Sequence, residues 1–534
     1  MRCLPSITAE ENDRGYTASV SQGPRGGIVY IIGAGPGDPG LISVRGAHNL
    51  ASADVVIYDH LVHPRLLRHA RSTAEKIDVG GAAPQPLEQE AICYLLAEKA
   101  REGKTVARLK WGDPFVFDNG GSEALFLHEQ GVRFEVVPGI PAGLGAATYA
   151  GIPLTYPGGG DTLTFIRGHE DDGKAKADVD WKSLAQLDGT LVCYAGPHRL
   201  PAITHALLTN GRPAEDTAAL IYNGTHPTQE TTIGTLEDIA RAAKESTDRR
   251  AAILVVGRVA ALREHLRWFD ARPLFGKRVL VTRPREQAGE LVEALEALGA
   301  EAIEAPLIRI MPPEDFQPLD DAIANVDRFT WIVFASANAV DAFMARLAAA
   351  SLDLRALKNT KVCAVGTATG ARLASAGLRA DLIPREFRAE SVVQALLAEG
   401  DVRGVRFLLP RADIGREVIA DELRARGADV QEVVAYRTVV AELERDGEPD
   451  IYRMLLDGKI DVVTFTSPSA VRHFVRVFGA DASADLLGST VVASIGPVTA
   501  EAATQQQIKT TVMPKEYTTA ALAQAIVEYF SEPV

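Results

Sequence analysis

The chain has few cysteines, and they are not arranged as a disulfide framework or a metal site. Four cysteines, at positions 3, 93, 193 and 363, are spread over 534 residues without a Cys-x-x-Cys pair. Isolated cysteines give neither a set of disulfides nor the usual ligand spacing of a zinc site. Cys193 and Cys363 lie in apolar runs and are interpreted as small core residues. We therefore expect no metal, and a reducing compartment such as the cytoplasm.

Runs of basic residues and long hydrophobic runs are missing as well. The chain has 56 Lys and Arg against 70 Asp and Glu, a net charge of −14. An acidic chain repels a phosphate backbone, so we expect no nucleic-acid partner. No apolar run approaches the roughly 18 residues needed to cross a bilayer, so we expect no membrane insertion. Residues 1–26 lack an apolar block and are expected to be a disordered tail, neither a signal peptide nor an anchor.

Short β-branched runs alternate with amphipathic helical stretches along the whole chain. Residues 28–33, 53–59, 134–139 and 251–257 are examples of such runs. This alternation is typical of α/β proteins with largely parallel sheets. A connector containing Pro273 and Gly276 separates two blocks of different character. We expect a first block over residues 27–270, a linker over 271–277 and a second block over 278–530.

The second block contains an internal repeat. Residues 278–305 align without a gap to residues 406–433, and three more pairs of segments follow at an offset near 130. These pairs are 331–340 with 462–471, 361–370 with 490–499, and 383–396 with 513–526. Two half-repeats of strand–helix units predict a bilobed block, and a cleft between lobes favours a small-ligand site.

The first block opens with a glycine-rich turn that is unsuited to a dinucleotide. The strand at 28–33 runs directly into residues 33–40, where glycines occupy positions 33, 35 and 37. Pro36 and Pro39 remove two amide donors where the phosphate-binding helix of a Gly-x-Gly-x-x-Gly fold should begin. The same prolines disfavour the ordinary methyltransferase version of such a turn. Further glycine-rich segments at 110–124 and 136–156 indicate either main chain against a ligand or tight turns, and composition leaves both open.

Taken in order, four segments of the first block resemble the uroporphyrinogen-III C-methyltransferases of the tetrapyrrole methylase superfamily. They are YIIGAGPGDPGLIS (30–43), ADVVIYDHLV (53–62), ARLKWGDPFVF (107–117) and VVPGIPAGLGAATYAGIPLTY (136–156). TFIRGHE (164–170), NGTHPTQ (223–229) and residues 251–269 continue the resemblance to the linker. It implies two α/β domains with S-adenosyl-L-methionine between them, and transfer of two methyl groups to uroporphyrinogen III to give precorrin-2.

The resemblance also implies site residues. Asp59 would be the proton acceptor, although without the family context a turn carboxylate at a strand end is the favoured interpretation. The residues expected to contact S-adenosyl-L-methionine are Pro36, Trp111, Gly112, Asp113, Val116, Pro141, Ala142, Ala195 and Gly224.

This sequence departs from the family pattern at four places. Trp111 stands where glycine is usual, and Gly81 where a lysine is proposed as proton donor. The Arg-Gly-Gly after the Phe is here Asp118-Asn119-Gly120-Gly121, and Ala195 replaces a methionine. Either His60 or His63 fills the proton role, or this half is slow, altered in substrate or inactive.

The second block has no paired catalytic carboxylates, nucleophile elbow or metal cluster, but three features recur in both repeats. An Arg follows the first strand, a Ser follows the second, and a Gly-x-x-Thr turn opens a helix. The residues are Arg283 and Arg411, Ser336 and Ser467, and Thr369 and Thr499. Hydroxyls, guanidinium groups and helix N-terminal amides suit carboxylates. The hydroxyls could instead be simple helix caps, which a duplicated fold would duplicate.

This block resembles uroporphyrinogen-III synthase over about residues 276–530, through RVLVTRP (278–284), VVAYRTV (433–439), TFTSPSAV (464–471) and SIGPVTAEAA (494–503). The resemblance implies cyclisation of hydroxymethylbilane to uroporphyrinogen III with inversion of the last ring. Tyr436 would assist loss of the terminal hydroxyl, while the recurring hydroxyls hold propionates and acetates.

Together the two resemblances imply a bifunctional enzyme of siroheme or cobalamin precursor synthesis, with a possible homodimer through the first block. One alternative keeps the synthase and makes the first block a non-methylating tetrapyrrole binder. Another makes the second block a small-ligand sensor attached to a methyltransferase.

Overall fold

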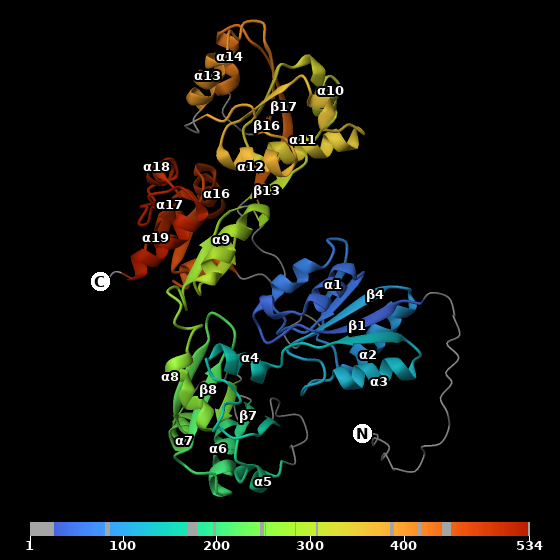
Figure 1. Ribbon diagram of the computed structural model, residues 1–534, viewed down its shortest axis with the longest axis vertical. Helices are drawn as coiled ribbons and strands as arrows, with labels where there is room; N and C mark the ends of the chain where they lie inside the picture. The colour runs from blue at the N-terminus through green and yellow to red at the C-terminus, as the bar shows by residue number, and fades with distance from the viewer. Residues whose placement is uncertain are drawn as a thin grey trace. The chain divides into compact units, whose positions relative to one another are not determined.

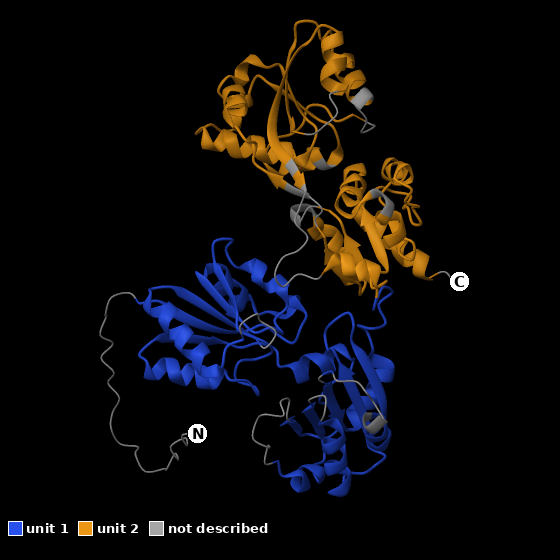
Figure 2. Cartoon of the chain, turned by 180° about the vertical axis from the view of Figure 1, so that it is seen from behind, with its two compact units in different colours: residues 1–276 blue, residues 277–534 orange. Residues whose placement is uncertain are grey.

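The computed structural model describes residues 26–80, 86–168, 179–195, 199–245, 250, 252–283, 285–305, 308–384, 389–413, 418–440 and 450–531. The chain divides into two compact units, residues 1–276 and 277–534 (Figure 2). Both units are built of sheets covered by helices, which confirms the expected α/β class. Cys193 and Cys363 are fully buried core residues, as expected. Within the described ranges, no helix is long and apolar enough to cross a membrane.

The first unit begins with a parallel sheet of five strands in the order β3-β2-β4-β1-β5. Helix α1 (Val44–Ser52) covers one face, and α2 (Gln89–Arg101) and α3 (Gly120–Glu129) cover the other (Figure 1). The carboxyl ends of parallel strands share one edge, where ligands of such sheets usually bind. The strands are β1 (Ile28–Gly33), β2 (Val55–Tyr58), β3 (Glu75–Asp78), β4 (Thr105–Lys110) and β5 (Arg133–Val137).

A second sheet of the same unit is mostly antiparallel, in the order β6-β7-β10-β8-β9. Helix α4 (Ala142–Tyr149) packs on one face, and α5 (Trp181–Ala185), α6 (Leu200–Thr209) and α7 (Leu236–Glu245) pack on the other. The short helix α8 (Arg263–Leu266) follows the last strand. The strands are β6 (Leu163–Arg167), β7 (Thr190–Ala195), β8 (Thr217–Tyr222), β9 (Glu230–Thr235) and β10 (Ala252–Val256).

The second unit has two lobes, each with its own sheet. The split lobe (residues 277–305 and 450–531) has the strand order β12-β11-β18-β19, and the continuous lobe (residues 308–440) has β13-β17-β16-β14-β15. The split lobe contains β11 (Arg278–Val281), β12 (Glu301–Glu304), β18 (Val462–Phe465) and β19 (Val491–Ser494). The continuous lobe contains β13 (Ile308–Met311), β14 (Trp331–Phe334), β15 (Lys361–Ala364), β16 (Arg406–Ala412) and β17 (Asp429–Val440).

The helices of this unit follow the same division. The split lobe carries α9 (Arg285–Ala297), α15 (Ile451–Leu456), α16 (Pro468–Phe478), α17 (Ala480–Leu486), α18 (Pro497–Gln505) and α19 (Thr519–Ser531). The continuous lobe carries α10 (Gln317–Ala324), α11 (Ala337–Ala349), α12 (Thr367–Ser375), α13 (Ala389–Ala398) and α14 (Val418–Ala425).

The predicted repeat is visible in the strand register, but its halves are not the lobes. Val279 pairs with Val462 in the split lobe, and Phe407 pairs with Trp331 at the equivalent place in the continuous lobe. Each lobe therefore joins the first strand pair of one half-repeat to the second strand pair of the other. The bilobed prediction is confirmed, and the two half-repeats interleave because each central strand pair is formed between them.

Candidate functional site

The turns after β1 and β4 lie against each other at the carboxyl edge of the first sheet. Gly35 and Gly112 form an isolated β-bridge, and both adopt left-handed φ angles of 81° and 69°. The indole Nε1 of Trp111 donates a hydrogen bond of 3.1 Å to the carbonyl oxygen of Pro36. Trp111 also packs on the apolar cluster around α4. Three of the residues predicted to contact a methyl donor, Pro36, Trp111 and Gly112, are thus brought together.

Helix α4 is made of small residues because loops of both sheets press against it. A Cβ atom at Gly145 would lie 2.5 Å from Cγ of Pro36, and one at Gly224 would lie 2.4 Å from Cβ of Ala146. Pro141 and Ala142 begin this helix. The hydroxyl of Tyr194, from β7, accepts a hydrogen bond from the amide of Gly143. We call the main chain around Pro36, Gly112, Pro141, Ala142 and Gly224 the glycine cradle.

Asp113 holds this edge together through its side chain. One carboxylate oxygen accepts the amide of Phe115 at 2.8 Å, and the other accepts the amide of Gly139 at 3.0 Å. Its carbonyl accepts the amide of Val116 at 3.3 Å. Both carboxylate oxygens of Asp113 already accept main-chain amides, so this side chain stabilises the cradle. If Asp113 contacts a ligand, it would do so through its main chain.

Backbone strain collects around the cradle. Five non-glycine residues of the described chain have positive φ angles. Two of them, Ser351 and Gln507, lie just after the ends of helices α11 and α18, away from the cradle residues in the sequence. The other three are Phe117 (57°), Asn223 (48°) and Thr225 (72°), beside Asp118 and Gly224. Non-glycine residues held in this region cost about 1–3 kcal/mol each and cluster at functional sites.

Ala195 does not join the cradle through its side chain. It packs with Leu191 and Cys193 in the core on the α6 and α7 face, whereas the cradle lies on the α4 face. Gly81, and His169 and Glu170 of the TFIRGHE motif, lie outside the described residues.

Asp59 follows β2 at the same sheet edge and belongs to an ion cluster that the sequence analysis missed. Its Oδ1 accepts a hydrogen bond of 2.6 Å from Nη2 of Arg108. Arg108 also contacts Glu123 at 3.2 Å, and the ammonium of Lys110 lies 3.0 Å from Glu123, 3.2 Å from Asp118 and 3.7 Å from Asp59. We call Asp59, Arg108, Lys110, Asp118 and Glu123 the ion cluster.

The three central members of the ion cluster are inaccessible to solvent. Arg108 and Lys110 are 1% exposed and Glu123 is 0% exposed, whereas the Asp59 and Asp118 side chains are 27% and 23% exposed. Burial opposes ionisation of Glu123, but Arg108 and Lys110 outweigh it and lower the pKa of Glu123. Burial raises the pKa of Asp118, against the attraction of Lys110. Asp59 and Asp118 are therefore the two members of the ion cluster that solvent reaches.

The two histidines considered for proton transfer differ in their surroundings. His60 is exposed. His63 accepts the amide of Arg65 on Nδ1 and stacks on His226, with ring centroids 6.4 Å apart. Burial, with Arg65 and His226 close by, lowers the pKa of His63 to about 4. His63 is thus a neutral capping residue at pH 7.

In the second unit, each lobe carries one equivalent set of the predicted residues at the carboxyl edge of its sheet. Arg283, Ser467 and Thr499 follow β11, β18 and β19 in the split lobe. Arg411 lies next to the last residue of β16 in the continuous lobe, where Ser336 and Thr369 follow β14 and β15. Equivalent positions carry equivalent chemistry because the repeats interleave.

Both serines are helix caps, as the plainer interpretation proposed. Ser336 accepts the amide of Ala339 and begins α11, and Ser467 accepts the amide of Ala470 and begins α16. Ser336 does more, because its Oγ lies 3.0 Å from the hydroxyl of Tyr436 on β17. The structure thereby joins two residues predicted for the synthase site.

The two arginines are not equivalent in their contacts. Arg411 forms an ion pair of 3.1 Å with Glu432, which also pairs with Arg424 at 2.9 Å. Arg283 makes no hydrogen bond or ion pair with any residue in the described ranges. Burial, only partly offset by Glu290, lowers the pKa of Arg283. A partly buried guanidinium that has no hydrogen-bond partner among the described residues suits a carboxylate ligand.

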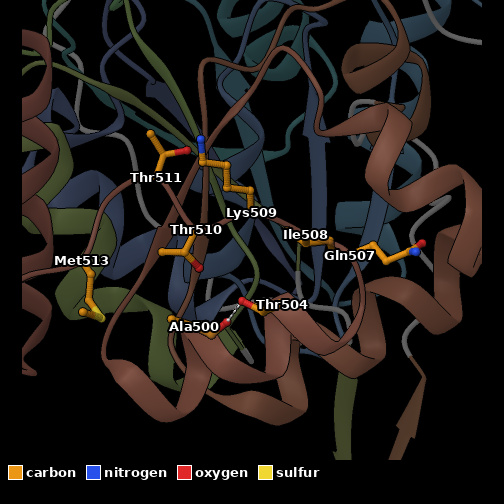
Figure 3. Close-up of a pocket in the computed structure, with 8 residues that line it drawn as sticks. All are labelled: Ala500, Thr504, Gln507, Ile508, Lys509, Thr510, Thr511 and Met513. Carbon is orange, nitrogen blue, oxygen red and sulfur yellow. Dashed lines mark hydrogen bonds between the residues drawn. The ribbon is translucent and has the colours of Figure 1, made fainter.

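A groove elsewhere in the split lobe contains none of the predicted residues. Ala500 and Thr504, one turn apart on α18, line one side, and the segment from Gln507 to Met513 lines the other (Figure 3). The side chains of Thr504, Gln507, Lys509 and Met513 are exposed.

Comparisons with known proteins match both units. Residues 28–240 match the family "Tetrapyrrole (Corrin/Porphyrin) Methylases", and residues 289–524 match "Uroporphyrinogen-III synthase HemD". The "Porphyrin biosynthesis protein HemD" of Ruminiclostridium josui is 37% identical over 491 residues, which cover 92% of this chain and 95% of that protein. The "Uroporphyrinogen-III C-methyltransferase" of Bacillus subtilis is 37% identical over 334 residues, or 62% of this chain and 68% of that protein.

A solved structure also matches the chain. The uroporphyrin-III C-methyltransferase of Thermus thermophilus, in complex with S-adenosyl homocysteine, is 35% identical, covers 44% of this chain and 100% of its own, and has a TM-score of 0.39. The sequence matches are decisive, since one relative is matched over almost its whole length. The chain therefore belongs to the family of fused proteins in which a tetrapyrrole methylase is followed by a uroporphyrinogen-III synthase of the HemD type.

Proposed function

We propose that the chain catalyses two consecutive reactions. Residues 278–530 cyclise hydroxymethylbilane to uroporphyrinogen III with inversion of the last ring, and residues 27–270 methylate uroporphyrinogen III twice with S-adenosyl-L-methionine to give precorrin-2. The observation that supports the proposal is that in each unit residues predicted for the site lie at the carboxyl ends of parallel strands, within family matches that follow one another along one chain.

The glycine cradle fits the methyl donor. The nearest atom to a Cβ built on Gly112 is 3.7 Å away, so its main chain has room for a ligand in direct contact. Pro36, Pro141, Ala142 and Gly224 add main chain without bulky side chains. S-adenosyl-L-methionine supplies a methyl group on a positively charged sulfur, which is already electrophilic. The cradle therefore needs only to hold and align this group against the ring carbon.

Asp59 manages the proton in this scheme. Methylation of a pyrrole carbon leaves a positive charge on the ring, which is cancelled when the ring loses a proton. Arg108 fixes one oxygen of Asp59 at 2.6 Å, while the side chain remains 27% exposed. A carboxylate that is held in place by a buried arginine and is still partly exposed to solvent is suited to accept that proton.

In the second unit, the hydroxyls of Tyr436 and Ser336 serve the first step. The Tyr436 hydroxyl donates a proton to the departing hydroxyl of hydroxymethylbilane, and Ser336 orients it at 3.0 Å. Arg283 and the N-terminal turns of α11, α12, α16 and α18 hold the substrate carboxylates. Ring closure then depends mainly on the shape in which the linear tetrapyrrole is held, so the site needs few acidic side chains.

The hydrogen bond between Trp111 and Pro36 favours one alternative, in which the first unit binds tetrapyrroles without methylating them. The indole reaches Pro36 inside the region where the donor would bind. The two functions are separated by the W111G variant. If the indole supports the cradle, W111G binds S-adenosylhomocysteine more weakly than the wild type. If the indole blocks the donor, W111G binds it more tightly.

Incubation of the purified chain with hydroxymethylbilane, with and without S-adenosyl-L-methionine, tests the proposal. We expect uroporphyrinogen III without the donor and a doubly methylated product with it. Uroporphyrinogen III without any methylated product would leave only the synthase. Formation of the spontaneous type I isomer alone would favour a second unit that acts as a small-ligand sensor.

We also propose that the first unit forms a homodimer, because methyltransferases of the resembling family are commonly dimers. Sedimentation of the 57.2 kDa chain at micromolar concentration should show a particle of twice this mass. A monomer would contradict this part of the proposal.

A further inference from the structure

The ion cluster has one negative charge too many for its buried surroundings. Arg108 and Lys110 contribute two positive charges, and Asp59, Asp118 and Glu123 contribute three negative charges when all are ionised. A buried group of charges is most stable when it is neutral. Uptake of one proton would make this cluster neutral.

Glu123 cannot be the site of that proton. It is fully buried and contacts Arg108 and Lys110, and it also accepts a hydrogen bond of 3.0 Å from the side-chain amide of Gln89. All three contacts donate to a charged carboxylate. Arg108 fixes Asp59 in the same way. Asp118 is different, because the ammonium of Lys110 at 3.2 Å and the main-chain amide of Asn119 at 2.6 Å both reach its Oδ1, whereas its Oδ2 has no such contact with the described residues and can take the proton.

Lys110 stands between the two open carboxylates. Its Nζ is 3.7 Å from Oδ2 of Asp59 and 3.2 Å from Oδ1 of Asp118, and the lysine itself is 1% exposed. An ammonium in this position can give a proton to one carboxylate and then, as a neutral amine, take a proton from the other carboxyl group when that group is protonated. The cluster is also not a saturated structural network, since the buried Nη1 of Arg108 has no hydrogen-bond partner in the described structure.

We infer that Asp118 is a positioning residue that receives, through Lys110, the proton that Asp59 takes from the methylated ring, and so readies Asp59 for the second transfer. The inference rests on the proposed methylation. The methylated carbon carries no hydrogen, so the proton leaves from a neighbouring C–H bond of the macrocycle, and the electron pair of that bond stays on the macrocycle and cancels its positive charge. Lys110 first gives a proton to Asp118 and becomes a neutral amine, and this amine then takes the proton from Asp59. Asp59 is then a free carboxylate again, Lys110 is unchanged, and Asp118 is neutral.

A titration that needs no activity tests the coupling. In the full chain labelled with ¹³C at aspartate carboxyl carbons, the Asp118 signal is assigned with the D118N variant and followed against pH. We expect the pKa of Asp118 to lie above the usual aspartate range, and to fall in D59N because a neighbouring negative charge is lost. An ordinary pKa that is the same in D59N would overturn the inference. The E129Q variant, on an exposed face of α3, should leave the signal unchanged.

Product analysis then tests the role in the reaction. D118N keeps an oxygen to accept the Asn119 amide. We expect the ratio of singly to doubly methylated product to rise at least about tenfold in D118N, and D118E to restore it. E129Q should give the ratio of the wild type. A wild-type ratio in D118N, with D59N inactive, would overturn the inference and leave the proposed function intact. A wild-type chain that transfers no methyl group would overturn the proposed function itself, and the titration would still decide the coupling.

Discussion

The hydroxyl of Tyr436 lies 3.0 Å from Oγ of Ser336, although the two residues are 100 positions apart in the sequence. Tyr436 lies on β17 and Ser336 follows β14, and strand β16 lies between these two strands and pairs with both. Ser336 opens α11 directly after β14, so its hydroxyl caps a helix and faces the tyrosine at the same time. Ser336 therefore has a structural contact, the helix cap, and a contact with the proposed catalytic tyrosine, and variants can measure the two contributions separately.

The Y436F variant should lower kcat of the synthase reaction by about 10–100-fold, since it removes the proposed proton donor and keeps the ring. Tyr436 is 9% exposed and its ring packs in the core of the continuous lobe, so the thermal midpoint should change little. The type III isomer formed from hydroxymethylbilane, followed by chromatography, is the measurement. An unchanged kcat in Y436F would show that the hydroxyl has no part in the reaction.

Replacement of the two capping serines separates the cap from the tyrosine contact. S336A and S467A each remove one N-cap and should each cost about 0.5–2 kcal/mol of stability. Only S336A also removes the partner of Tyr436, so it should lower kcat further than its effect on stability explains. Urea denaturation and initial rates of both variants check this, and equal kcat values for S336A and Y436F would indicate that the two hydroxyls act as one unit.

The two equivalent arginines should respond differently to substitution by methionine. R283M should raise KM for hydroxymethylbilane about tenfold or more, because a charge-assisted contact to a carboxylate is lost. R411M should act mainly on stability, since it breaks the ion pair with Glu432 and leaves that glutamate with Arg424. Steady-state kinetics with thermal melts decides this, and a larger KM effect in R411M would reverse the assignment.

The E123Q variant should destabilise the first unit by about 3–5 kcal/mol, because it leaves Arg108 and Lys110 without their buried partner. The pKa of Glu123 is lowered in the folded chain, so its contribution is present above the unfolded pKa and is lost as pH falls through the folded pKa. The difference between wild type and E123Q in urea denaturation should therefore shrink in acid. E129Q serves as the exposed control, and a loss as small as that of E129Q would contradict the burial argument.

His63 should make the first unit sensitive to mild acid. Its pKa is about 4 in the folded chain against an ordinary 6.5, so the unfolded chain binds the proton first as pH falls. Stability should fall between about pH 6.5 and 4, by roughly 3 kcal/mol at most, since one pKa unit corresponds to about 1.4 kcal/mol. H63N keeps an acceptor for the Arg65 amide and should flatten this slope. Parallel slopes for both proteins would contradict the prediction.

The sequence was enough to place the residues that stand at strand ends. Asp59, Pro36 and Gly112 follow three strands of one parallel sheet, so their common edge follows from the fold class alone. The register of the half-repeats likewise predicts that Ser336 and Ser467 occupy equivalent places.

Contacts that depend on strand order could not be predicted in the same way. Two aligned half-repeats are compatible with separate or interleaved lobes, because local propensity does not fix which strands pair across long distances. Arg108 and Lys110 carried a usable signal, since two cations on one face of an apolar strand require buried countercharges. That these are Glu123, Asp59 and Asp118 depends on where α3 packs, which the sequence does not show.

The most direct test of the account is the conversion of hydroxymethylbilane by the single purified chain in the presence of S-adenosyl-L-methionine labelled with ¹³C in its methyl group. Mass spectrometry and NMR of the product report both steps at once. We expect a type III ring arrangement that carries two labelled methyl groups, with D59N stopping at uroporphyrinogen III and Y436F forming uroporphyrinogen III about 10–100-fold more slowly. A type I arrangement, or a type III product without label, would contradict the account.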